Sequence, residues 1–232
     1  ATVLADSSGN GRTGTFAAAA NRPAYNTSEF PSRMIQTASC TFDGGTGAQN
    51  DSSNIGSDAT WDAIIGNAAG STQKMTFSAW IRPLSDGHNN FGRILDFGLQ
   101  DVALFVSGES SGAVYLNYSA RFTGAIGTWN TTSRAIILDQ WTHVAVTFDA
   151  TSASNNPDIY INGVLVSVTE SATPSGNYDG ITGTSCHIGN NSSTNRTFDG
   201  QLADIAVWNS TLTNEDIAAI YNASKLEENY GP

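Results

Sequence analysis

The sequence predicts an all-β protein: two antiparallel sheets stacked as a jelly-roll sandwich, followed by a short C-terminal helix. Three observations support this fold class. Short β-rich segments recur along the whole chain and are separated by Gly, Asn, Asp and Ser. The dipeptide Asn162-Gly163 lies between two alternating apolar stretches, which is typical of a two-residue hairpin. Only one stretch, near the C-terminus, has the pattern of an amphipathic helix, so alternating strand and helix units are not expected.

Strands are predicted where apolar residues alternate with polar ones or form short runs. In residues 142–149, for example, Val144, Val146 and Phe148 face one way and His143 faces the other. We expect the first side to pack inward and the second to form a more polar surface. The predicted strands cover residues 39–42, 75–82, 93–97, 102–107, 113–118, 135–138, 142–149, 158–161, 164–168, 185–188 and 202–208.

The C-terminal helix has both a start signal and an apolar stripe. Thr213 is the expected N-cap, Asp216 follows three residues later, and Ile217, Ile220 and Tyr221 share one face. We expect this helix to cover one sheet or one end of the sandwich. Residues 43–73 and 119–133 are rich in Gly, Ser, Thr and Asn and are predicted to be long connections. No repeat or linker divides the chain, which predicts a single domain over residues 1–232.

The composition limits the partners. The formal net charge is −11 and only 13% of residues are charged, so no basic stripe is present to neutralise phosphates and nucleic acid is not an expected partner. Divalent cations and neutral polar ligands such as glycans suit this balance better. Apolar runs stay well short of the roughly 20 residues that a spanning helix needs, so membrane insertion is not expected. The N-terminus shows no charged region followed by an apolar core, but a start at Ala1 fits removal either of an initiator Met or of a signal peptide, so export is left open.

Cys40 and Cys186 lie far apart in the sequence, each in a predicted strand, without a spacing that indicates zinc or a redox pair. They are either buried free thiols or one long-range disulfide, and the tendency of free Cys to pack as a small hydrophobic residue favours the thiols.

Seven segments follow one another along the chain: Asp6-Ser-Ser-Gly-Asn-Gly11 and its continuation to Thr15, Cys40-Thr-Phe-Asp-Gly44, residues 75–83, 141–149 and 159–166, Ile188-Gly-Asn190, and residues 198–221. Together and in this order they resemble the laminin-G-like, concanavalin A-like lectin/glucanase jelly-roll family, over nearly the whole chain. The resemblance implies two stacked antiparallel sheets, one of them concave. It does not by itself imply one function, because this architecture is found in lectins, adhesion modules, glycanases and structural domains.

The resemblance also implies a structural calcium site. The turn at residues 6–11 concentrates hard oxygen ligands of the kind calcium prefers. In the resembled family this turn lies against the penultimate strand, so Asp6, Asn10 and Asp204 would hold the ion. The alternative is that Asp6 only caps its own turn.

No catalytic residues are predicted, so the chain is not expected to be an enzyme. Glycanases of the resembled fold carry acidic residues at alternate positions of one strand, and no such run occurs in this sequence. The three histidines are scattered, and no Gly-x-Ser-x-Gly motif accompanies them.

Glycan binding is the sharper functional hypothesis. Aromatic rings stack against the C–H faces of sugars, while amide or carboxylate groups bond to their hydroxyl groups. The candidate ligand-binding residues, taken from the predicted loops, are Trp61, His88, Asn90, Phe91, Trp129, Asn130 and Tyr178. The alternative for Trp61 and Trp129 is that they pack over the edge of the core.

The sequence therefore favours a non-enzymatic recognition or surface-display module of a virion, such as a phage decoration, fibre or attachment protein, or of an extracellular appendage. A secreted carbohydrate-binding domain of a larger protein is the first alternative. A polysaccharide hydrolase or lyase with atypical catalytic residues is the second, and a scaffold that packs against identical neighbours is the third. The expected partners are a glycan or neighbouring subunits of an oligomer, and the expected location is a virion or the cell exterior.

Overall fold

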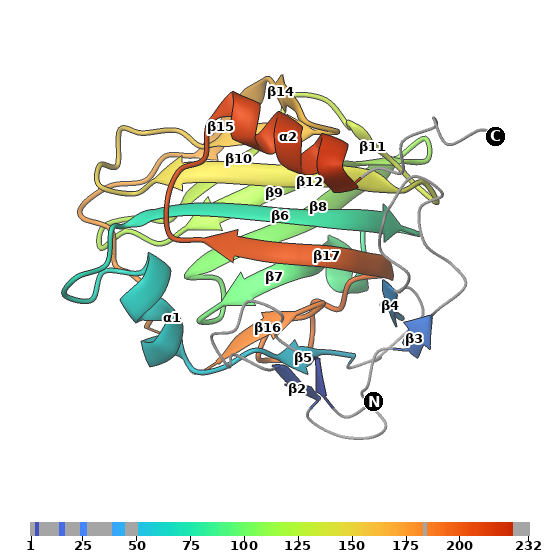
Figure 1. Cartoon of the computed structure of the whole chain (residues 1–232), viewed down its shortest axis with the longest axis horizontal. Helices are drawn as coiled ribbons and strands as arrows, with labels where there is room; N and C mark the ends of the chain where they lie inside the picture. The colour runs from blue at the N-terminus through green and yellow to red at the C-terminus, as the bar shows by residue number, and fades with distance from the viewer. Residues whose placement is uncertain are drawn as a thin grey trace.

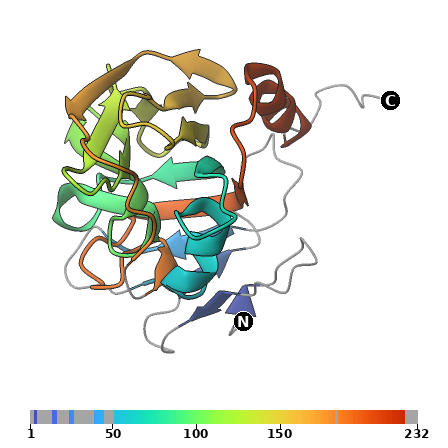
Figure 2. The ribbon, with the colours of Figure 1, turned by 90° about the vertical axis from the view of Figure 1, so that its left-hand side faces the viewer.

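The computed structural model describes residues 3–4, 14–16, 24–26, 39–44, 51–182 and 185–224. Two antiparallel sheets face each other, and a helix lies on the outside of one of them. Figure 1 looks onto the seven-stranded sheet with α2 in front of it, and Figure 2 shows the other sheet on the side away from α2. The predicted fold class, an antiparallel jelly-roll sandwich with a short C-terminal helix, is confirmed.

The larger sheet has ten strands and the smaller one has seven. In spatial order the larger sheet contains β1 (Val3–Leu4), β2 (Gly14–Phe16), β5 (Ser53–Asn54), β16 (Cys186–Ile188), β7 (Phe91–Phe97), β8 (Val102–Ser110), β9 (Ala113–Ala120), β10 (Gly127–Thr131) and β15 (Val168–Ala172), with β11 (Ile136–Ile137) paired to β9. The smaller sheet contains β14 (Val164–Val166), β13 (Asp158–Ile161), β12 (Thr142–Asp149), β6 (Lys74–Pro83), β17 (Gly200–Trp208), β4 (Ser39–Phe42) and β3 (Ala24–Asn26). Each predicted strand corresponds to one of these, and β4, β12 and β13 begin and end where the sequence predicts.

The core lies between the two sheets and is rich in aromatic rings. Tyr118 of β9 packs against Trp129 of β10 and against Phe148 of β12, with ring centroids 6.1 and 5.4 Å apart. Phe77 of β6 lies 5.6 Å from Phe97 of β7, so rings from both sheets interdigitate across the interface.

The turn between β13 and β14 is the predicted hairpin. Asn162 and Gly163 both adopt positive φ angles, 52° and 76°, as the type I′ turn requires. A Cβ atom at residue 163 would lie 2.7 Å from Cδ1 of Tyr221, so the helix packed beside the turn adds a second reason for glycine.

Helix α2 (Asn214–Ser224) begins at the predicted capping box. The backbone amide of Asp216 donates to Thr213 Oγ1 at 3.2 Å, and the amide of Thr213 donates to Asp216 Oδ2 at 3.0 Å. Ile217 is fully buried against Ala145 and Tyr160, so the helix covers the outer face of the seven-stranded sheet.

This cover corrects one expectation about β12. Val144, Val146 and Phe148 pack into the core as predicted. The opposite side is not a polar surface, however, because His143 is 1% exposed and its ring packs against those of Trp80 and Tyr221, with centroids 5.5 and 5.6 Å away.

Two predicted loops contain regular structure. Residues 43–73 include helix α1 (Asp58–Ile65), which Ser57 caps by accepting a bond from the amide of Thr60. Residues 119–133 include the end of β9 and the whole of β10. Both elements are short, and their Gly, Thr, Asn and Asp content is typical of loops, which explains why the prediction was wrong there.

Cys40 and Cys186 are free thiols, as the sequence favoured. Burial raises the pKa of the Cys186 thiol to about 12, so this side chain is a neutral part of the core at physiological pH. Among the described residues, no helix is long and apolar enough to cross a membrane.

Candidate functional site

Three of the predicted ligand-binding residues are buried. Trp61 in α1 is 8% exposed and Trp129 in β10 is fully buried, so their ring faces are closed to a sugar. Tyr178 is 4% exposed and packs on Phe122, and its hydroxyl donates to the carbonyl of Ile65. A surface role for these three is wrong. The alternative, that both tryptophans pack over the core, is correct, and their indole N–H groups are satisfied by the Ile55 carbonyl and by Asn156 Oδ1.

The other four predicted residues lie on or beside the outer face of the ten-stranded sheet. His88 and Asn90 belong to the 3-10 turn η2 (His88–Asn90), which leads directly into β7 at Phe91. Asn90 is exposed and Phe91 is 42% exposed. Asn130 is half-buried in β10, on the same face as its cross-strand partner Asn117. The structure therefore brings His88, Asn90 and Phe91 together and places Asn130 three strands away.

The strand register arranges the outer face in rows. Phe91 of β7 lies opposite Ser107 of β8, which lies opposite Tyr115 of β9. We call these three residues the aromatic row. Two strand spacings separate its ends by about 10 Å. Because Ser107 and Tyr115 are half-buried and Phe91 is exposed, this row is open to ligands.

An arginine lies over each aromatic ring of the row. The guanidinium carbon of Arg196 is 5.2 Å from the Phe91 ring centroid, and that of Arg134 is 4.6 Å from the Tyr115 ring. In the next row, Arg93 lies 4.3 Å from the ring of Phe105, its cross-strand partner. These distances are within the range of cation–π contacts, so the rings and guanidinium groups order one another.

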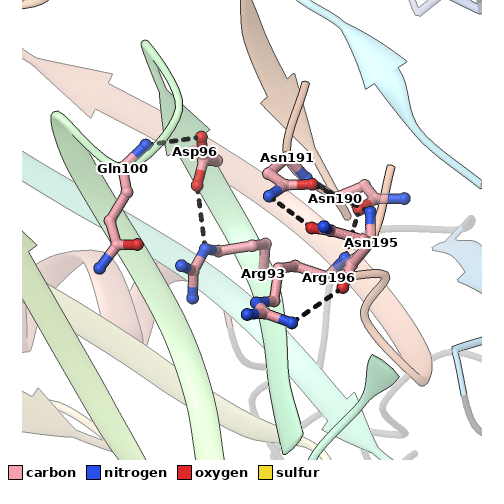
Figure 3. Close-up of polar contacts among 7 residues, drawn as sticks. All are labelled: Arg93, Asp96, Gln100, Asn190, Asn191, Asn195 and Arg196. Atoms are coloured by element: carbon pink, nitrogen blue, oxygen red, sulfur yellow. Dashed lines mark hydrogen bonds and ion pairs between the residues drawn. The ribbon is translucent and has the colours of Figure 1, made fainter. Parts of the chain in front are cut away.

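Amide side chains fix the loop that carries Arg196 (Figure 3). Asn190 Oδ1 accepts bonds from the backbone amides of Asn191 and Arg196, at 2.9 and 3.0 Å. Asn191 closes the loop by bonding Asn195 through both amide atoms, at 3.0 and 3.1 Å. The carbonyl of Arg196 then accepts from the amide of Arg93, which anchors the loop to β7.

Arg93 and Asp96 form a buried ion pair behind the row (Figure 3). Their Nε and Oδ2 atoms are 2.9 Å apart, and the residues are 3% and 0% exposed. Burial lowers the pKa of the Arg93 guanidinium and raises the pKa of the Asp96 carboxyl, while their mutual attraction opposes both shifts. Asp96 also accepts a bond from the amide of Gln100, so the pair is held in place on both sides.

Sequence reasoning missed Tyr115 and all three arginines. Strict alternation puts Arg93 and Asp96 on opposite faces of a strand, but the register shifts between Arg93 and Leu95, and this irregularity brings both side chains to the outer face. A search for arginines beside exposed aromatic positions would have found Arg196 only after the fold had placed its loop beside Phe91.

Two open cavities lie elsewhere. The larger, of about 600 Å³, is lined mainly by hydroxyl and amide side chains, including Asn67, Ser154 and Asn177, with Tyr178 as its one aromatic residue. The smaller, of about 450 Å³, lies between β12–β13 and the start of α2. Neither is lined by an aromatic side chain as exposed as Phe91 of the aromatic row.

Of the predicted calcium ligands, Asp6 and Asn10 lie outside the described residues. Asp204 is half-exposed at an irregularity of β17, where its φ angle is 48°. In the part of the chain that the structure describes, no group of three or more His, Cys, Asp and Glu side chains could hold a metal ion. One of the three predicted ligands thus lies in the described part of the chain, and calcium remains a proposal.

Comparison with known families gives the same class as the fold. A laminin G family model, described as the concanavalin A-like lectin/glucanases superfamily, matches residues 56–218. The chain belongs to this family. No match is found among curated proteins.

Solved structures of the same fold include domain 4 of AbnA, a GH43 extracellular arabinanase from Geobacillus stearothermophilus, in complex with arabinotriose. It is 18% identical with a TM-score of 0.59, over 94% of this chain and 92% of that one. The binding domain of botulinum neurotoxin DC in complex with SialylT is 13% identical with a TM-score of 0.59, over 92% of this chain but 47% of that one. A native heptameric SAP-like pentraxin from Limulus polyphemus is 18% identical with a TM-score of 0.50, over 65% and 70%. At these identities the similarity shows the fold.

Proposed function

We propose that this protein is a glycan-recognition module whose binding site is the aromatic row. The observation that carries the proposal is the alignment of Phe91, Ser107 and Tyr115 across three strands of one outer face. Aromatic rings stack on sugar C–H faces, and the hydroxyl between them, with Asn90 nearby, bonds to sugar hydroxyl groups. A site formed by rigid strands loses little entropy when it binds.

The comparisons support this function as an analogy of fold. The arabinanase domain was solved with arabinotriose, and another domain of the same fold was solved with SialylT. The sandwich thus serves elsewhere as a platform for saccharides, although the site of each protein must be argued from its own residues.

Mutation of the row tests the function directly. Glycan-array binding identifies the best ligand, and calorimetry then measures its Kd. The Kd should rise about ten-fold or more for Phe91→Ala and for Tyr115→Ala, because each variant loses the aromatic surface that the bound sugar would cover. Leu165→Ala is the matched control: Leu165 is 47% exposed on β14 of the other sheet, and its loss should leave Kd unchanged. Equal effects of all three variants, or an array without any ligand, would refute the proposal.

The module acts without breaking bonds, in this proposal, and faces the outside medium on a virion or a cell surface. Chromatography of the bound oligosaccharide after prolonged incubation should show an unchanged chain length. Shortened products that disappear on substitution of a single carboxylate or histidine would instead support the hydrolase or lyase alternative. Detection of the protein in purified virions, or of a signal peptide upstream in its gene, decides between a virion component and a secreted domain.

A further inference from the structure

We infer that the glycan bound by the aromatic row is acidic, with carboxylate or sulfate groups that pair with Arg134 and Arg196. The inference rests on the proposed function and names the ligand class of the same site. It comes from the distribution of charge over the described residues.

Arg134 and Arg196 are unusual among the cations of the described chain. Four others are neutralised by aspartates: Lys74 pairs with Asp149, Arg82 with Asp139, Arg93 with Asp96, and Arg121 with Asp101. Within the described residues, Arg134 and Arg196 have no carboxylate partner. In a chain of net charge −11, it is notable that these two cations lie at opposite ends of one row.

Both guanidinium groups are oriented before a ligand arrives. Arg134 donates from Nε to the carbonyl of Gly108 at 2.6 Å and lies over Tyr115. Arg196 donates from Nη1 to the carbonyl of Asn195 at 3.2 Å and lies over Phe91. Each keeps further N–H donors for a ligand, and a guanidinium fork matches a carboxylate or sulfate better than it matches a single hydroxyl.

The positions of the rings set the spacing of the two cations. Phe91 and Tyr115 stand two strands apart, so the guanidinium groups above them flank the central Ser107 over a span of about 10 Å. A linear oligosaccharide along the row would place its rings against the parts of Phe91 and Tyr115 that the guanidinium groups leave uncovered, and its acidic groups beside the arginines.

Two carboxylates lie near the same edge and limit the charge of the site. Asp86 Oδ2 accepts a bond from the backbone amide of Glu109, which follows Gly108 and is exposed. The site is therefore not a broad basic patch. We expect selectivity for acidic ligands to come from direct pairing with the arginines. Removal of the Glu109 charge should strengthen the binding of acidic ligands, because it removes a repulsion.

The test uses matched acidic and neutral probes. Oligogalacturonate carries carboxylates, and its carboxyl-reduced form is the neutral counterpart. Sulfated galactan oligosaccharides carry sulfate groups instead. An array of further acidic glycans with neutral counterparts extends the set. We expect acidic members to bind at least ten-fold more tightly than their neutral partners, and the preferred acid identifies carboxylate or sulfate.

Variants then assign the preference to the two arginines. Arg134→Gln and Arg196→Gln should each weaken the binding of acidic ligands about ten-fold, and the binding of any neutral ligand by much less. Glu109→Gln should lower the Kd of acidic ligands about two- to five-fold. Arg82→Gln, which removes a paired arginine of the other sheet, is the control, and thermal melting confirms that each variant is folded.

The outcomes separate this inference from the proposed function. Neutral glycans that bind as tightly as acidic ones, with loss of binding in Phe91→Ala but not in the arginine variants, would overturn the inference and keep the function. An acidic preference that the arginine variants do not alter would also overturn it. Absence of binding to every glycan would overturn both.

Discussion

At the scale of single residues, the outer face of the ten-stranded sheet contains charges from which water is excluded. Arg93 and Asp96 are both nearly inaccessible, and each depends on the other for compensation. Removal of one partner leaves an uncompensated buried charge, whereas removal of both charges leaves none.

Asp96→Asn should therefore lower the free energy of unfolding by about 3–5 kcal/mol, measured by urea denaturation. The double variant Arg93→Met/Asp96→Asn should regain most of that loss. If the double variant were less stable than Asp96→Asn, the buried pair would not be the cause of the destabilisation.

His143 is a second buried titratable group, and it makes stability depend on pH. Burial lowers its pKa from 6.5 to about 4, and in the described part of the chain neither ring nitrogen has a hydrogen-bond partner. As the pH falls below about 6.5, the unfolded chain takes up a proton that the folded chain excludes until about pH 4. Stability is therefore fully present above pH 6.5 and decreases through that window.

Between pH 7.5 and 4.5 the wild type should lose about 2–3 kcal/mol more of its unfolding free energy than His143→Phe, which keeps a ring against Trp80 and Tyr221 but cannot titrate. Urea denaturation at several pH values measures this difference. Parallel pH profiles for the two proteins would contradict the assignment.

The sequence predicted residue positions well where alternation is regular and poorly where it is interrupted. Val144, Val146 and Phe148 follow the period of two and were assigned correctly to the core. Trp61 and Trp129 have polar neighbours that predict loops, and the sequence leaves open whether their rings are exposed or pack over the edge of the core. Composition alone does not show which way a single aromatic residue points.

At the scale of elements, α2 shows how a short helix is stabilised by what it covers. Its capping box satisfies free amides at the N-terminus, but an isolated helix of this length is marginal, so packing must contribute most of its stability. Ile217 is the residue that the helix buries completely against β12 and β13.

Ile217→Ala should cost about 2–4 kcal/mol in chemical denaturation, through lost burial and the cavity that remains. Ala219→Ser is the matched control, since residue 219 lies on the exposed side of α2 and the change should stay within about 0.5 kcal/mol. A similar small effect of both substitutions would show that α2 does not stabilise the sandwich.

Strong local signals predicted this helix and the Asn162-Gly163 hairpin, whereas α1 and β10 have weaker ones. Helix α1 is only eight residues long and buries two side chains, Trp61 and Ile65, one turn apart. Strand β10 is completed by its neighbours β9 and β15, and its own sequence has Thr and Asn at the alternate positions. Its strand conformation is therefore imposed by tertiary pairing.

At the scale of the whole molecule, the order of strands and turns was enough to predict two stacked sheets, but not the site. The aromatic row joins residues 91, 107 and 115 with arginines at 134 and 196, which only the completed sheet brings side by side. Of the predicted ligand-binding residues, His88, Asn90 and Phe91 lie together because they are consecutive or nearly so in the chain.

Calcium is the prediction that concerns the stability of the whole domain. If Asp6, Asn10 and Asp204 hold the ion, chelation should lower the melting temperature, because metal binds only the folded form. Calcium titration should restore it in the wild type but not in Asp6→Ala. If neither the chelator nor Asp6→Ala changes the melting temperature, the proposed calcium site is refuted.

The central claim is that the outer face of the ten-stranded sheet binds glycans. Backbone amide NMR during titration with the best array ligand tests it most directly. The account predicts that the perturbed amides cluster on β7, β8 and β9 around Phe91, Ser107 and Tyr115, with the loop that carries Arg196. Perturbations that cluster instead around Asn67, Ser154 and Asn177, at the larger cavity, would contradict it.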